Sequence, residues 1–371
     1  MTSRNIRWDN DEEKGKAKPF LLKPAGKDYL WGGTRLIDEY GKESGLKPLA
    51  ETWECSTHPD GTSIVASGEW EGSLLSEVLK EHPEYLGRHG MQLNPGLDAE
   101  GKRCLGRIGK DGKRKEADAG IQGGLPVLIK FIDARSDLSI QVHPNDQYAG
   151  EKENGQLGKT EMWYVLDADK GTQLIYGLYH DVDKETLRRS IQEGTVEKYL
   201  QKVKIRKGDV YYIEPGTIHA IGEGALVVEV QESSNLTYRL YDYGRKDKNG
   251  KGRELQIGKA LEVANLKGSK APVQPMRVLR YGKGFAKELL CRCKYFEVHR
   301  IVMNTECLRE MVSYWADGMS FRVLLCVEGC GSLLIEEGEY ICFFKGDCIF
   351  FPADSVRVRI HGKAEFLEVR G

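Results

Sequence analysis

Short apolar runs of about four to seven residues, separated by Gly, Pro and Asp, recur along most of this chain. Runs of this length are typical of β-strands, because helices usually need about ten residues or more. The clearest runs are residues 63–66, 127–133, 138–143, 161–166, 173–176, 210–213 and 225–230. Helical spacing interrupts them in two insertions, about 74–124 and 183–204, the second with Asp183 as its expected N-cap. The sequence therefore predicts a mainly β fold with a few inserted helices.

An internal repeat indicates that the β-structure is built twice. Lys207-Gly-Asp opens an apolar strand followed by a Pro turn and His219. Lys345-Gly-Asp opens a similar unit, which has Arg357 where the first unit has His219. Repeated strand–turn units of this kind predict two related β-barrels, of which the second lacks the imidazole and is expected to be structural. The expected divisions are a polar N-terminal tail (1–18), a first barrel (19–265) and a second barrel without a metal site (266–371).

Charge and composition exclude several classes of function. Lys and Arg number 55 against 56 Asp and Glu, so the net charge of −1 gives no electrostatic footprint for nucleic acid or an anionic membrane. No apolar run approaches the ~18 residues of a membrane-spanning helix, and the first residues lack the apolar stretch of a signal peptide. The nine cysteines are scattered without a CxxC pair. Reduced thiols in a cytoplasmic protein are the expected arrangement.

Polar side chains that share strand faces predict a lined cavity. Residues two apart in a strand point the same way, so Ser139, Gln141 and His143 share one face. On a later strand Lys159 and Glu161 also share a face. Three polar residues on one face of a strand are unusual for a packed core.

A metal site can be assembled from these strands and the Pro215-Gly turn. His143, Glu161 and His219 supply two imidazoles and a carboxylate, and Gln141 adds an amide oxygen. Such a set suits Zn²⁺ or a similar divalent ion, with a coordination position left for water or substrate. Each residue alone would be a weak signal, and the prediction depends on their occurring together.

Charged residues in the following segment add a second element. Glu229 lies on one predicted strand and Arg239 on the next. Together with Lys159, Arg239 would offer a phosphate clamp and electrostatic support for a developing enediolate. A hydrophilic stretch from 244 to 256 is predicted to be a solvated loop.

Several motifs carry a resemblance to a known family. They are Tyr29-Leu-Trp-Gly-Gly, Glu51-Thr-Trp-Glu-Cys-Ser-Thr-His-Pro-Asp-Gly, Gln141-Val-His-Pro-Asn-Asp, Gly158-Lys-Thr-Glu-Met-Trp-Tyr-Val-Leu, Pro215-Gly-Thr-Ile-His-Ala-Ile-Gly and Thr237-Tyr-Arg-Leu-Tyr-Asp-Tyr-Gly-Arg. In order and spacing they resemble the type I phosphomannose isomerases, in their shorter bacterial form. The resemblance covers nearly the whole chain and implies cupin-like barrels (jelly rolls). The chain departs from that form in its N-terminal tail and in a charged insertion between residues 88 and 124.

The resemblance also implies roles for individual residues. It implies that one Zn²⁺ is bound by Gln141, His143, Glu161 and His219 in a catalytic first barrel. It further implies that Arg239 is the active-site arginine, with Lys159 and Ser139 near the phosphate or the sugar oxygens. Glu229 occupies the position of a carboxylate considered as proton carrier in the family.

The implied reaction is the interconversion of mannose 6-phosphate and fructose 6-phosphate through an enediolate. In this scheme the metal polarises the sugar oxygens, Glu229 or a metal-bound water moves the proton, and Arg239 with Lys159 stabilises the charge.

Three alternatives remain open at this point. The first is a cupin Fe²⁺ oxygenase, because two His and one carboxylate suit that chemistry too, although it has no obvious use for a phosphate clamp. A second alternative is a sugar-phosphate-binding protein without catalysis. In the third, the same isomerase chemistry acts on free mannose or on another sugar phosphate.

Overall fold

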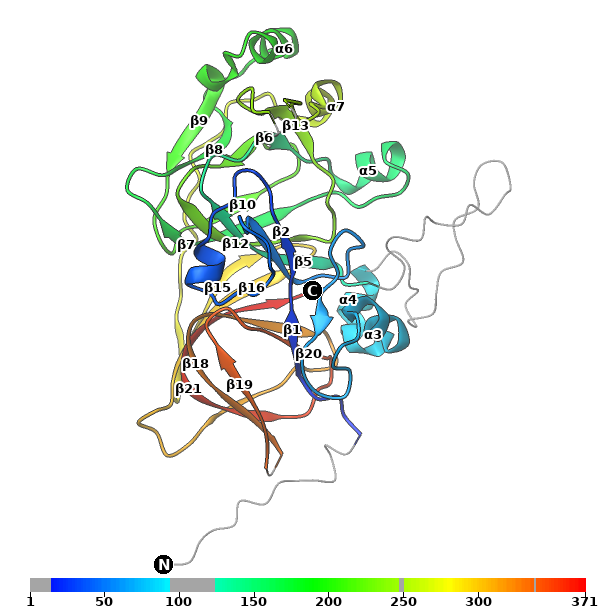
Figure 1. The fold of residues 1–371 in the computed structure, drawn as a ribbon, viewed down its shortest axis with the longest axis vertical. Helices are drawn as coiled ribbons and strands as arrows, with labels where there is room; N and C mark the ends of the chain where they lie inside the picture. The colour runs from blue at the N-terminus through cyan, green and yellow to red at the C-terminus, as the bar shows by residue number, and fades with distance from the viewer. Residues whose placement is uncertain (1–14, 94–123, 247–249, 337) are drawn as a thin grey trace, which may run out of the picture.

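The computed structural model describes residues 15–93, 124–246, 250–336 and 338–371. Most of the predicted tail and the greater part of the charged insertion lie outside these residues. The described chain is mainly β with a few short helices, as predicted (Figure 1). Within the described part of the chain, no helix has the length and apolar character required to cross a membrane.

The strands form three sheets. A ten-stranded sheet contains β1 (Phe20–Lys23), β4 (Ile64–Val65), β14 (Arg280–Gly282), β15 (Phe285–Arg292), β16 (Glu297–Asn304), β17 (Val312–Tyr314), β18 (Arg322–Glu336), β19 (Glu339–Phe344), β20 (Cys348–Phe351) and β21 (Val358–Arg370). A six-stranded sheet contains β2 (Ala25–Lys27), β3 (Glu51–Cys55), β5 (Val127–Ala134), β7 (Glu161–Ala168), β10 (Val210–Ile213) and β12 (Ala225–Glu232). A five-stranded sheet contains β6 (Ile140–Val142), β8 (Gln173–Leu178), β9 (Leu200–Lys204), β11 (His219–Ile221) and β13 (Tyr238–Tyr241).

Helices are short and lie around the sheets. They are α2 (Arg35–Asp38), α3 (Leu75–Glu81), η1 (Pro83–Leu86), α4 (Gly87–Leu93), α5 (Asp146–Lys152), α6 (Lys184–Gln192), η2 (Val196–Tyr199) and α7 (Ile257–Val263). The predicted cap of α6 is confirmed, because the Asp183 side chain accepts a hydrogen bond from the Thr186 amide at 2.9 Å. The helical prediction was wrong for residues 200–204, which form strand β9 because they pair with β8.

Each predicted apolar run contains a strand, and the alternation of side chains explains why those runs are so apolar. In β5, Ile129 and Phe131 face the ten-stranded sheet, together with Met162 of β7 and Val228 of β12. On that sheet Val323, Leu325, Leu367 and Val369 belong to the same buried cluster. The two sheets therefore share one core, in the middle of the molecule in Figure 1.

The predicted division at residue 265 does not separate the sheets. Strand β1, near the N-terminus, pairs with β20, and Phe20 lies opposite Phe350. Strand β1 is thus part of the C-terminal sheet. The first unit (residues 19–265) and the second unit (residues 266–371) are therefore joined by hydrogen bonds as well as by the shared core.

The internal repeat is present in the structure. Gly208 and Gly346 both have positive φ, and the following Asp209 and Asp347 each accept a hydrogen bond from the amide three residues earlier. The registers match as well, since Ile213 of β10 lies opposite Glu161 and Phe351 of β20 lies opposite Arg322.

In the second copy of the repeat, Arg322 therefore occupies the position that Glu161 has in the first copy. The guanidinium of Arg357, at the position equivalent to His219, lies 4.1 Å from the ring centroid of Trp315. Arg322 and Arg357 are both positively charged, so neither is suited to bind a metal ion. We therefore propose that the second unit serves a structural role.

The buried ion pair of Lys42 and Glu54 links the first unit to the second through a hydrogen bond to Gly346. Lys42 donates to Glu54 at 2.6 Å and to the carbonyl oxygen of Gly346, and both side chains of the pair are buried. We expect Lys42→Met to lower the free energy of unfolding by about 3–5 kcal/mol, because it leaves a buried carboxylate without its partner. Denaturant titration measures this change, with Lys170→Met at an exposed position as the control. A loss below about 1 kcal/mol would contradict the assigned role of the pair.

Candidate active site

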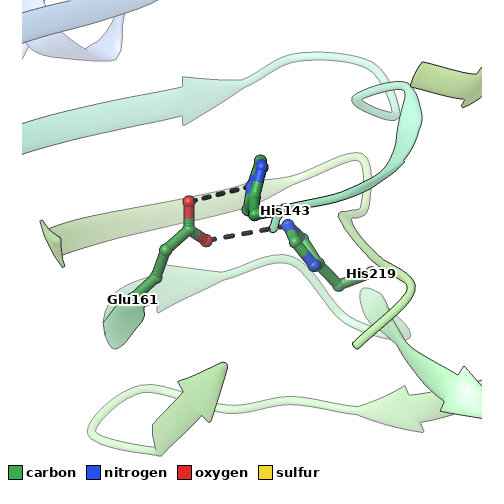
Figure 2. A group of neighbouring side chains, drawn as sticks. All are labelled: His143, Glu161 and His219. Atoms are coloured by element: carbon green, nitrogen blue, oxygen red, sulfur yellow. Dashed lines mark ion pairs between the residues drawn. The ribbon is translucent and has the colours of Figure 1, made fainter. Parts of the chain in front are cut away.

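Three ionisable side chains that are far apart in the sequence meet in the first unit. His143 follows β6, Glu161 begins β7 and His219 begins β11. Figure 2 shows both imidazole rings and the carboxylate directed toward one another. One ligand atom of each residue lies within 4.8 Å of the other two. Nε2 of His143 is 3.2 Å from Oε1 of Glu161, and Nε2 of His219 is 3.6 Å from Oε2.

Both imidazoles present Nε2 because their Nδ1 atoms are engaged. Nδ1 of His143 lies 2.9 Å from the carbonyl oxygen of Leu236, and Nδ1 of His219 lies 2.8 Å from that of Thr217. A carbonyl oxygen can only accept, so each Nδ1 carries the hydrogen. Burial and the nearby Lys159 lower the pKa of His143 to about 3, and burial lowers the pKa of His219. Both rings are therefore neutral near pH 7, the form that binds metal ions.

Glu161 supplies the negative charge. It is fully buried, and neither carboxylate oxygen has a hydrogen bond of good geometry, although Nζ of Lys159 lies 2.8 Å from Oε1. Burial opposes ionisation, but Lys159 and His143 hold the pKa of Glu161 well below its ordinary value. A buried carboxylate with unsatisfied oxygens, beside two neutral imidazole nitrogens, fits a divalent metal ion.

A backbone contact links the segments that carry the two imidazoles. The amide of Gly216 donates to the carbonyl oxygen of His143 at 2.8 Å, and Gly216 has a φ of 89°. A Cβ atom at Gly216 would lie 2.9 Å from the carbonyl oxygen of Val263. The Pro215-Gly turn is thus required for the approach of the His219 segment to His143.

One row of the five-stranded sheet carries three of the predicted residues. Gln141 of β6 lies between His219 of β11 and Arg239 of β13 in the strand register. The amide nitrogen of Gln141 is placed 3.4 Å from Nε2 of His219, and a flip of the amide would put its oxygen there. Arg239 donates from Nε to the hydroxyl of Ser139 at 3.0 Å. Arg239 and Ser139 therefore form a pair at one end of the row.

The six-stranded sheet contributes a second row of Trp163, Glu229, Lys130 and Trp53. Nζ of Lys130 lies 2.9 Å from Oε1 of Glu229, and Nε1 of Trp163 donates to Oε2 at 2.9 Å. The centroid of the Trp163 ring is 5.4 Å from that of His219, so this row faces the imidazoles. Both oxygens of Glu229 are thus hydrogen-bonded, and its row lies on the side of the sheet that faces the group of His143, Glu161 and His219.

Known proteins resemble this chain in sequence and in structure. A model of the catalytic domain of type I phosphomannose isomerase matches residues 20–96. Mannose-6-phosphate isomerase ManA of Bacillus subtilis is 35% identical over 352 residues, which cover 94% of this chain and 97% of that protein. The mannose-6-phosphate isomerase of Streptococcus mutans is 34% identical over 336 residues, covering 91% and 93%.

The chain belongs to the type I phosphomannose isomerases. A crystal structure of the mannose 6-phosphate isomerase from Bacillus subtilis superposes with a TM-score of 0.79 at 34% identity, covering 96% of this chain and all of that one. A structure from Archaeoglobus fulgidus, at 21% identity and a TM-score of 0.65, shares the fold.

Lys130 is a residue of this isomerase-family site that sequence reasoning missed. Burial opposes its charge, but Glu229 and Glu51 raise the pKa of Lys130 above its ordinary value. A signal was present, because Lys130 interrupts the otherwise apolar run 127–132. A lysine in a fully buried strand needs a buried acidic partner.

A pair of carboxyl groups supports the loop that leads into Glu161. Glu232 accepts from the amide of Thr160 at 2.7 Å and lies within hydrogen-bonding reach of Asp146. Tyr295, from the second unit, donates to Asp146 at 2.6 Å. Burial and the charge of Asp146 raise the pKa of Glu232 to about 8. Glu232 is therefore protonated at neutral pH and shares its proton with Asp146.

This pair predicts a pH dependence of stability. The raised pKa means that the folded state retains a proton which the unfolded state loses near pH 4.5, so stability falls as the pH rises from about 5 to 8. We expect the free energy of unfolding of Glu232→Gln to exceed that of the wild type by more than about 1 kcal/mol at pH 8, and by less at pH 5. Thermal unfolding across this pH range measures the difference, with Glu193→Gln at an exposed site as the control. Parallel curves for Glu232→Gln and wild type would refute the shared proton.

Proposed function

We propose that this chain interconverts mannose 6-phosphate and fructose 6-phosphate through an enediolate, with one Zn²⁺ held by Gln141, His143, Glu161 and His219. The observation that carries the proposal is the convergence of His143, Glu161 and His219, with unsatisfied carboxylate oxygens, beside the row that contains Glu229. The names of the curated relatives support the same substrate.

The metal ion, when bound, would polarise the oxygens at C1 and C2 of the open-chain sugar. Glu229 is assigned the proton transfer between these carbons, because its carboxylate lies against Trp163 on the side of the imidazoles. Lys130 orients Glu229 through its hydrogen bond to Oε1 and balances its charge. The site thus holds a carboxylate in a dry, charge-compensated setting.

We assign two tasks to the cationic side chains: they stabilise the negative charge of the enediolate, and they bind the substrate. Lys159 lies beside Glu161 and His143, where it can stabilise an enediolate oxygen near the metal. Arg239, held by Ser139, lies farther along the same row as Gln141 and is assigned to the sugar or its phosphate.

Removal of one ligand tests the metal site. We expect Glu161→Gln to lose both the metal and activity on mannose 6-phosphate, by about 100-fold or more, because the charged ligand is gone. Elemental analysis after dialysis and a coupled assay measure both, with Glu193→Gln as the control. Full activity of the chelator-treated wild type would reject a metal-dependent reaction, and a different metal restoring activity better than Zn²⁺ would reject zinc.

A second substitution tests the proton carrier separately from the metal. We expect Glu229→Gln to lower kcat by about 100-fold or more while the bound metal stays at the wild-type level, because the amide cannot accept the proton. Steady-state kinetics and elemental analysis on the same preparation measure this outcome. Wild-type turnover in this variant would show that Glu229 is not the proton carrier.

The comparisons do not favour the alternatives of an Fe²⁺ oxygenase or a sugar-phosphate-binding protein without catalysis. Oxygen consumption with Fe²⁺ and turnover of mannose 6-phosphate distinguish them from the isomerase. A cytoplasmic location is part of the proposal, since the eight cysteines in the described residues carry free thiols.

A further inference from the structure

Two arginines bind Asp242, the residue that follows β13, and a third arginine lies nearby on that strand. Asp242 is buried and accepts from Arg253 through Nε at 2.8 Å, and Nε of Arg245 lies 3.1 Å from its Oδ1. Arg239 stands on the same strand, three residues before Asp242. The group therefore carries three positive charges against one negative charge.

Arg239 lies beside Arg253, because its Nη1 donates at 3.1 Å to the carbonyl oxygen of Glu254, the next residue along the chain. Burial and the charges of Arg253 and Arg245 lower the pKa of Arg239, although Asp242 acts in the opposite direction. Like charges are held together in this way at a cost, which an anion bound between them would offset.

Unused donors remain in this cluster. Arg239 donates from Nε to Ser139 and from Nη1 to the carbonyl oxygen of Glu254. Arg253 uses Nε and Nη2 on Asp242. Among the residues that the structure describes, Nη2 of Arg239 and Nη1 of Arg253 donate no hydrogen bond, so each has N–H groups available for a ligand.

Charges from both the arginine cluster and the Glu229 row act on Tyr29. Burial and the charge of Glu51 raise the pKa of Tyr29 to about 12, whereas Lys130 and Arg253 act to lower it. The phenol therefore lies within electrostatic range of both Lys130, which holds Glu229, and Arg253. The Arg253 side chain is itself 30% exposed, so a ligand can reach it from solvent.

We propose that Arg253, together with Arg239, binds the phosphate group of the sugar phosphate. This inference rests on the proposed function and adds a residue from the stretch 244–256, which its composition alone predicts to be a solvated loop. A phosphate dianion matches the two excess positive charges, and each of the two guanidinium groups has one terminal nitrogen left to donate to a phosphate oxygen. Lys159 is less suited to this task, because its ammonium group is paired with the buried Glu161. Asp242 holds Arg253 in place.

Substitution of Arg253 tests the proposal. We expect Arg253→Gln to raise KM for mannose 6-phosphate by about 10- to 100-fold, the loss expected for a charge-assisted hydrogen bond, with kcat changed by less than about threefold. The inhibition constant of inorganic phosphate should rise by a similar factor. Arg206→Gln, at a side chain that is 85% exposed, is the matched control and should change neither value.

The outcomes separate this inference from the proposed function. A wild-type KM and inhibition constant in Arg253→Gln would overturn the assignment of Arg253. Absence of turnover by the metal-loaded wild type would reject the isomerase, while calorimetric binding of inorganic phosphate that weakens in Arg253→Gln would still support the phosphate site. Should Arg253→Gln not fold, Arg253→Lys retains the charge but lacks the guanidinium fork that binds Asp242 and a phosphate oxygen at once, and a KM or phosphate affinity equal to wild type in that variant overturns the assignment.

Discussion

The two-residue alternation of side chains in β5, β7 and β12 is the constraint on which the site depends. On one face Phe131, Met162 and Val228 pack against the second unit. On the other face Lys130, Trp163 and Glu229 lie in one cross-strand row. A slip of one residue in any of these strands would bury a charge in the shared core and remove a functional group from the site. The apolar core between the units thus also fixes the register of the row of Lys130, Glu229 and Trp163.

Much of the fold could be predicted because these strands are buried on both faces, which makes their sequences short and apolar. The convergence of His143 with Glu161 and His219 could be predicted for a different reason, since polar residues at 139, 141 and 143 keep one strand face hydrophilic. It was harder to predict from the sequence which strands pair with one another. The place of β1 beside β20 depends on contacts across the whole chain, for which local sequence carries no signal. For the same reason residues 200–204 were assigned to a helix, although pairing with β8 makes them a strand.

Individual site residues show the same limit. Lys130 carried a local signal, a lysine in an apolar run, but its partner Glu229 lies 99 residues away in the sequence. Arg253 carried none, because an arginine in a hydrophilic stretch is ordinary until Asp242 is seen beside it. Residues that act through a local pattern can be found from sequence, whereas those that act through long-range pairing need the fold.

The pairing of β1 with β20 has a consequence for how the protein is made. Residues 20–22 leave the ribosome well before their partners at 348–350, which lie more than 300 residues later in the chain. Until the C-terminal strands emerge, β1 has only β4 to pair with, and the apolar faces of β5, β7 and β12 lack the sheet that covers them. The nascent chain therefore carries exposed apolar surface until those strands have been made, and surface of this kind makes folding intermediates prone to aggregation.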